Sequence, residues 1–104
     1  MSVDARIWKY PFDINDVAAI PMPVGARVLH VETQDGVPCL WALVNAEAPH
    51  ALHRFRVVRT GHPISHISDL VYVGTFRTEK TRDDGHGRID YMSHVWHLFA
   101  ERAQ

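Results

Sequence analysis

Arginine and histidine side chains gather in one part of this 104-residue sequence. Residues 50–66 contain three arginines and four histidines but no acidic residue. A guanidinium offers paired hydrogen-bond donors in a planar fork, so this composition suits a phosphate or carboxylate group. Strand alternation puts Arg54 and Arg56 on one side, where the alternative is a solvated face whose arginines pair with acids on neighbouring strands. The predicted binding residues of this stretch are Arg54, Arg56, Arg59, Thr60 and His62.

Histidine spacing raises the question of a metal site. The eight histidines include three closely spaced pairs, which are His50 and His53, His62 and His66, and His94 and His97. Zinc sites use such spacings, but they normally include cysteine or carboxylate ligands as well. On a strand, His94 and His97 would point to opposite faces, whereas on a helix they would share one. Because spacing is a weak signal without a predicted geometry, we expect surface or hydrogen-bonded histidines, no metal site and no cofactor.

The three tryptophans fall in three different predicted strands. Trp41 lies within an apolar run, and we predict that it packs in the core. Trp8 and Trp96 have polar neighbours, so we predict that both are partly exposed and serve as interface anchors, with core packing as the alternative. Cys39 has apolar neighbours on both sides and is predicted to be a small buried residue. A nucleophilic cysteine would need a nearby histidine, which the sequence does not reveal.

Signatures of the common enzyme classes are missing. The sequence has no Gly-rich phosphate loop, no Gly-x-Ser-x-Gly elbow, no paired-cysteine motif and no His-Glu-x-x-His. We predict no catalytic residues and favour a binding protein, although these absences leave an unfamiliar active site open. A formal net charge of −1 argues against binding nucleic acid or an anionic membrane over the whole surface. The lone cysteine and the lack of a long apolar run indicate a cytosolic protein that does not span a membrane.

The elements that would position these residues are short strands. Apolar residues mostly alternate with period two between turn residues, which is typical of an antiparallel sheet. Asp35 and Gly36 predict a hairpin turn, because this pair tolerates positive φ angles. Residues 13–16 could start a turn or one turn of helix, which Pro21 and Pro23 then forbid from continuing. Strands are predicted at residues 6–10, 26–33, 37–44, 52–60 and 70–77.

The C-terminal third of the sequence is harder to interpret. Residues 78–90 have mixed charges and two glycines, so we predict a mobile, exposed loop. Residues 92–102 fit both helix and strand spacing, and periodicity does not decide between them. We predict a single domain over residues 1–104 that is mainly β, with α+β left open. Its antiparallel sheet of about six strands would curl into a small sandwich or a partial barrel.

Several uncommon words occur in order along the chain: IWKYPF, GVPCLWALV, RFRVVRTGHPI, YVGTF and VWHLF. In these words the sequence resembles a family of small uncharacterised proteins of tailed bacteriophages, over residues 6–99. The resemblance implies a phage origin, action in the cytoplasm of the bacterial host, and a strand for the final segment. The family has no assigned activity, so the resemblance implies no catalytic residues. The longer charged segment at residues 78–90 departs from the family pattern.

Three hypotheses of function follow from these observations. The first is a phage accessory protein that binds a host protein through the face around Arg54, Arg56 and His62. The second is a module that binds a small anionic ligand such as a nucleotide, and either sequesters it or hydrolyses it with the help of a histidine. The third is a homo-oligomer with a structural or assembly role, since edge strands favour pairing with another copy.

Overall fold

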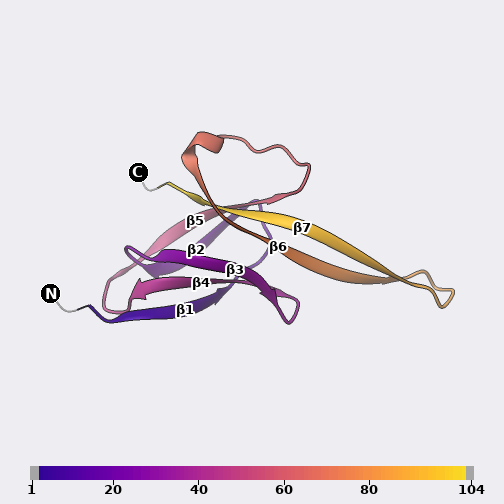
Figure 1. Cartoon of the computed structure of the whole chain (residues 1–104), viewed down its shortest axis with the longest axis horizontal. Helices are drawn as coiled ribbons and strands as arrows, with labels where there is room; N and C mark the ends of the chain where they lie inside the picture. The colour runs from indigo at the N-terminus through magenta and orange to yellow at the C-terminus, as the bar shows by residue number, and fades with distance from the viewer. Residues whose placement is uncertain (1–2, 103–104) are drawn as a thin grey trace.

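Two antiparallel β-sheets form the whole fold (Figure 1). The computed structural model describes residues 3–102, without the side chains of residues 82 and 90. Within this range there are seven strands, which make up 67% of the structure, and one short 3₁₀ turn. The sheets have three and four strands, and they do not close into a barrel. The predicted mainly-β fold is therefore confirmed, in its sandwich form and with one strand more than expected.

The three-stranded sheet has the order β1-β4-β3. Its central strand β4 (Val37–Asn45) is the apolar run of the sequence, and it lies between β1 (Ala5–Pro11) and β3 (Arg27–Gln34). The hairpin between β3 and β4 turns at Asp35 and Gly36, which have φ angles of 52° and 80°. Positive φ at both positions is what a two-residue type I′ hairpin turn requires, so the Asp-Gly prediction is confirmed.

The four-stranded sheet has the order β2-β5-β7-β6. Its strands are β2 (Val17–Pro23), β5 (His50–Arg59), β7 (Ile89–Glu101) and β6 (Leu70–Asp83). The sequence did not predict β2, because Pro21 and Pro23 argued against a regular element there. That interpretation was wrong, since β2 lies at the edge of its sheet, and an edge strand tolerates residues that cannot donate a ladder hydrogen bond.

The segment predicted as a loop at residues 78–90 is mostly strand. Pairing between β6 and β7 continues from Leu70 and Glu101 out to Asp83 and Ile89, so only residues 84–88 form a turn. The loop prediction was wrong because a two-stranded ribbon with solvent on both sides shows no apolar alternation. Residues 89–101 form a strand, which settles the helix-or-strand ambiguity in the way that the resemblance implied.

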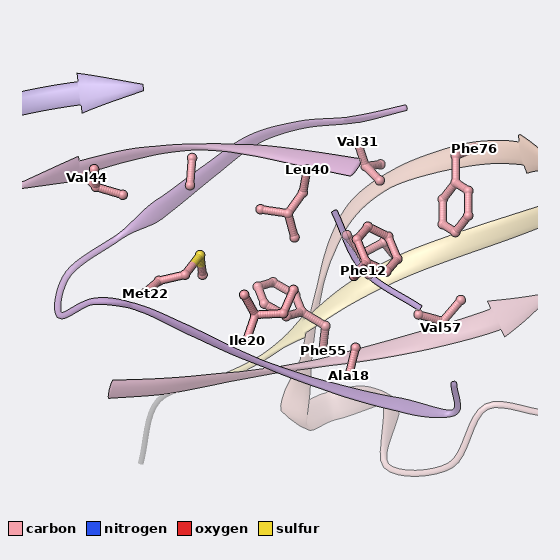
Figure 2. Packing of buried hydrophobic residues seen from close by; sticks show 12 residues of the cluster. Phe12, Ala18, Ile20, Met22, Val31, Leu40, Val44, Phe55, Val57 and Phe76 are labelled. Atoms are coloured by element: carbon pink, nitrogen blue, oxygen red, sulfur yellow. The ribbon is translucent and has the colours of Figure 1, made fainter. Parts of the chain in front are cut away.

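Buried apolar side chains from both sheets meet between them (Figure 2). Leu40 and Val44 from the three-stranded sheet face Met22 and Phe55 from the other, and all four are at most 2% exposed. At one side of the sandwich, β3 lies beside β6, where the Thr33 hydroxyl donates to the carbonyl of Arg77 at 2.6 Å. The side where β3 lies beside β6 is called here the closed side of the sandwich. The contact on this side holds β6, and β7 paired with it, in place where the two strands run out beyond the core.

Tyr10 has a buried side-chain hydroxyl. The Tyr10 hydroxyl makes no hydrogen bond within the described residues, and burial raises the Tyr10 pKa above its ordinary value of 10.0. As the pH rises, Tyr10 ionises first in the unfolded chain, where its pKa is lower. The stability that this group contributes is therefore fully present below pH 10.0, and it is lost as the pH rises through the higher pKa of the folded state.

We expect Tyr10→Phe to leave the free energy of unfolding at about pH 7 unchanged or raised, because it removes an unsatisfied buried hydroxyl. The variant should also lose less stability than the wild type between about pH 9 and about pH 11. Urea denaturation of both proteins across this range measures the difference. An identical alkaline slope in the two proteins would contradict the prediction.

Candidate functional site

A hollow lies at the end of β5, where the strand leaves the sheet. It has a volume of about 570 Å³. Four of the predicted binding residues line it, namely Arg56, Arg59, His62 and Trp96. The other lining residues are Ile14, Asn15, Asp16, Val57, Val58 and Pro63. The chain segment before β2, the end of β5, the following turn and β7 therefore meet at one concave place.

Local backbone geometry explains how the polar residues at the end of β5 come to line the hollow. Residues 59–62 form a turn in which the His62 amide donates to the Arg59 carbonyl at 3.0 Å. Gly61 has a φ angle of 90°, which the third position of a type II turn requires. On the other side, the Val57 amide donates to the carbonyl of Asp16 at 3.3 Å. The turn and this contact together bring Arg59, His62 and Asp16 to the same hollow.

The two arginines of the hollow have no carboxylate partner within the described residues. Arg56 Nη2 donates to Ser65 Oγ at 3.2 Å, while its Nε is buried and makes no hydrogen bond to any described group. Arg59 is exposed at the rim. Asp16 is the acidic residue of the lining, so the hollow has two guanidinium groups and one carboxylate. The local electrostatic balance therefore favours an anion.

Arg54 behaves differently from its two neighbours on β5. Its Nε donates to Glu101 Oε2 at 2.9 Å, in an exposed ion pair with β7. It lines a second, wider hollow of about 1280 Å³ rather than the first one. The pairing of Arg54 with an acid on a neighbouring strand is the alternative that the sequence left open for all three arginines. It holds for Arg54 but not for Arg56 or Arg59.

The two tryptophans predicted as interface anchors lie apart. Trp96 lines the hollow and is half-buried, and its indole Nε1 donates to Thr78 Oγ1 at 2.9 Å. Trp8 belongs to β1 of the other sheet, opposite Ala42, and it packs against the core. The structure therefore brings Trp96 to the arginines but not Trp8.

Thr60 takes part in a hydrogen-bonded chain rather than in the hollow. Its hydroxyl lies 2.7 Å from His97 Nε2 and donates to the Val95 carbonyl at 3.3 Å. Thr75 Oγ1 lies 2.9 Å from His97 Nδ1 and 2.6 Å from the Tyr72 hydroxyl. A threonine hydroxyl has one proton, which Thr60 donates to the Val95 carbonyl, so His97 Nε2 donates to the Thr60 oxygen. Sequence reasoning missed this chain because its members come from β6, from β7 and from the turn after β5.

The histidine pairs do not converge. Among the described side chains of residues 3–102, no three or more histidine, cysteine, aspartate or glutamate side chains are placed together to hold a metal ion. His94 and His97 lie opposite Thr78 and Thr75 on a regular strand pair, so their side chains point to opposite faces, as expected for a strand. The hollow's chemistry is therefore that of paired guanidinium donors with an imidazole beside them.

Comparison with known proteins identifies the family. The model of a family described as a domain of unknown function, DUF7352, matches residues 3–104, and the chain belongs to this family. No curated protein and no solved structure matches the chain. Among the described residues, no helix is long and apolar enough to cross a membrane.

Proposed function

We propose that this member of the DUF7352 family is a binding module for a small organic phosphate or carboxylate, which it holds in the hollow at the end of β5. The observation that carries the proposal is the convergence of Arg56 and Arg59 on one concave place with His62, neither arginine being paired with a described acid. Guanidinium groups bind such anions through charge-assisted hydrogen bonds in a matching planar geometry.

The size of the hollow supports a small ligand. About 570 Å³ falls within the range of roughly 300 to 1,000 Å³ that is usual for small-molecule sites. A mononucleotide is small enough for this volume, and it combines a phosphate with hydroxyl groups and a flat ring. In the hollow, Arg56 and Arg59 would hold the phosphate, while Asp16 and Asn15 would receive hydroxyl or amino groups. Val57, Val58 and Pro63 supply apolar wall.

Binding of a host protein through a broad basic face receives less support from this geometry. Arg54 is neutralised by Glu101, and Arg56 is hydrogen-bonded to Ser65 in the connection that follows β5. Among the basic residues that line the hollow, Arg59 and His62 are exposed, and neither side chain has a hydrogen bond or ion pair to another described residue. The phage origin and the location in the host cytoplasm stay predictions of the resemblance, which fractionation of infected cells would check.

Isothermal titration with AMP, ADP, cyclic AMP and inorganic phosphate tests the proposal. We expect at least one nucleotide to bind the wild type, and Arg59→Ala to weaken that binding by about tenfold or more through loss of a charge-assisted bond. Arg59 is exposed at the end of its strand, so this variant should keep its fold. The affinity should also fall as salt is added, because the attraction is between charges.

Arg54→Ala is the matched control. It removes the same side chain from the same strand, but from outside the hollow. Its affinity should stay within about twofold of the wild type, since the lost guanidinium already has a carboxylate partner. Absence of binding by all four ligands, or an equal loss in both variants, would refute the proposed site.

A further inference from the structure

The outer part of the β6–β7 hairpin, residues 78–94, is here named the arm. It runs on past the two sheets to its own turn (Figure 1). The buried core reaches no farther along these strands than Phe76 and Trp96. The molecule is accordingly long, with principal extents of 63, 29 and 16 Å. The large apolar side chains exposed on the arm are Ile89, Tyr91 and Met92, which are 59%, 78% and 40% exposed.

A two-stranded ribbon with no core of its own is marginally stable in water and leaves the backbone groups of both edges without partners. The β6 edge runs beside β3 as far as Arg77, whose carbonyl accepts from Thr33. The β7 edge runs beside β5 as far as Val95, whose carbonyl accepts from the Thr60 amide at 3.0 Å. Beyond these two points, no other described strand pairs with either edge of the arm, so each edge can pair with another strand.

Charge distinguishes the two edges. Four of the six residues 78–83 on β6 have a formal charge, against one of the six residues 89–94 on β7. A two-fold symmetric antiparallel pairing of β6 with itself, centred on residue 79, 80 or 81, would put like charges opposite each other. The clashing pairs would be Glu79 with Glu79, Lys80 with Lys80, or Glu79 with Asp83, and such pairs are destabilising. The β6 edge is therefore protected against self-pairing, whereas the β7 edge is not.

Backbone direction shows which groups β7 offers. In an antiparallel strand, the amide and carbonyl of one residue point to the same side, and successive residues alternate. Since the Val95 carbonyl points toward Thr60, the backbone groups of Ser93, Tyr91 and Ile89 point out of the same edge. In a symmetric pairing centred on Met92, Ser93 of one copy lies opposite Tyr91 of the other. Both residues then present their free backbone groups, and no two like charges lie opposite.

We infer that the arm binds a second copy of this chain, through antiparallel pairing of the two β7 edges around Met92. The two arms then form one four-stranded sheet in the order β6-β7-β7-β6, which is a self-complementary two-fold interface. Two Ser93 amides donate to two Tyr91 carbonyls across the axis. The Met92 side chains meet on one face of the new sheet, and those of Tyr91 shield the other.

Light scattering coupled to size-exclusion chromatography tests this inference, with Ser93→Pro as the variant. Proline has no amide hydrogen, and the Ser93 amide points out of the edge, so the variant removes a donor that only the dimer uses. We expect a wild-type dimer at about 100 μM and a rise of about tenfold or more in the dissociation constant for Ser93→Pro. Ser93→Ala keeps the amide and should dimerise like the wild type.

Met92→Lys gives a second and independent variant if proline disturbs the strand. It would place two positive charges together on the two-fold axis, so the dimer should dissociate at low salt and partly return at high salt. Circular dichroism tests whether each variant keeps its strands. A monomeric wild type at about 100 μM overturns the inference, as do a Ser93→Pro dimer of unchanged affinity and an open-ended series of larger species.

Discussion

Replacing Leu98 with alanine is expected to lower the free energy of unfolding by about 2 to 5 kcal/mol. Leu98 lies in β7 between β5 and β6, opposite Val57 and Gly74, and its side chain is 0% exposed. The substitution removes apolar contacts on both sides and leaves a cavity that the flanking strands cannot fully close. Domains of this size are stable by only about 5 to 15 kcal/mol, so a large share of the total would be lost.

Leu52→Ala is the matched control for this experiment. It makes the same chemical change on β5, where the side chain is 68% exposed. Surface substitutions of this kind usually change stability by no more than about 0.5 kcal/mol. Urea denaturation followed by tryptophan fluorescence measures both variants. Losses of similar size would mean that Leu98 does not occupy the centre of the core.

Gly74→Ala is expected to lower the free energy of unfolding by about 1 to 3 kcal/mol through overpacking. A Cβ atom on Gly74 would lie 2.7 Å from Cγ1 of Val31 across the closed side of the sandwich. Val31 is only 4% exposed, and a β-branched side chain has little freedom to move aside. The chain therefore needs glycine at this position for close approach of β3 and β6, and not for an unusual backbone angle.

The double variant Gly74→Ala, Val31→Ala separates this contact from other effects of adding a methyl group to β6. Val31→Ala alone should destabilise the protein, because it empties part of the core. The double variant should lose at least about 0.5 kcal/mol less than the sum of the two single losses, since each change relieves the other. Strict additivity in urea denaturation would show that the two residues do not meet.

Local sequence patterns were enough to predict most of the strands. The apolar run of β4 and the Asp-Gly pair before it identified a hairpin that the structure reproduces, with both turn residues at positive φ. Two elements were not predicted as strands, for opposite reasons. The prolines of β2 looked like interruptions, yet they are compatible with an edge strand. The polar arm looked like a loop, yet its backbone pairs as a regular ribbon without needing apolar alternation.

The candidate site was predictable in part. The composition of residues 50–66 indicated where arginine and histidine side chains gather, and Arg56, Arg59 and His62 do line one hollow. Strand alternation grouped Arg54 with Arg56, whereas Arg54 lines the second hollow and Arg59 joins Arg56 in the first. The acid-free composition of residues 50–66 did not reveal which acids come near in space. Glu101 meets Arg54 across 47 residues of sequence, and Asp16 comes to the hollow from the segment before β2.

What the sequence by itself determined are the properties set by neighbours along the chain: strand alternation, the positive-φ turns and the clustering of basic residues. Only the tertiary structure decided which arginine is paired with an acid and that Trp8 and Trp96 lie on different sheets. It also decided that residue 74 must be glycine to leave room for the Val31 side chain. The physical reason is the order of strands in the two sheets, which depends on how all the apolar faces pack together. That choice fixes every contact between distant residues, and no short stretch of sequence contains it.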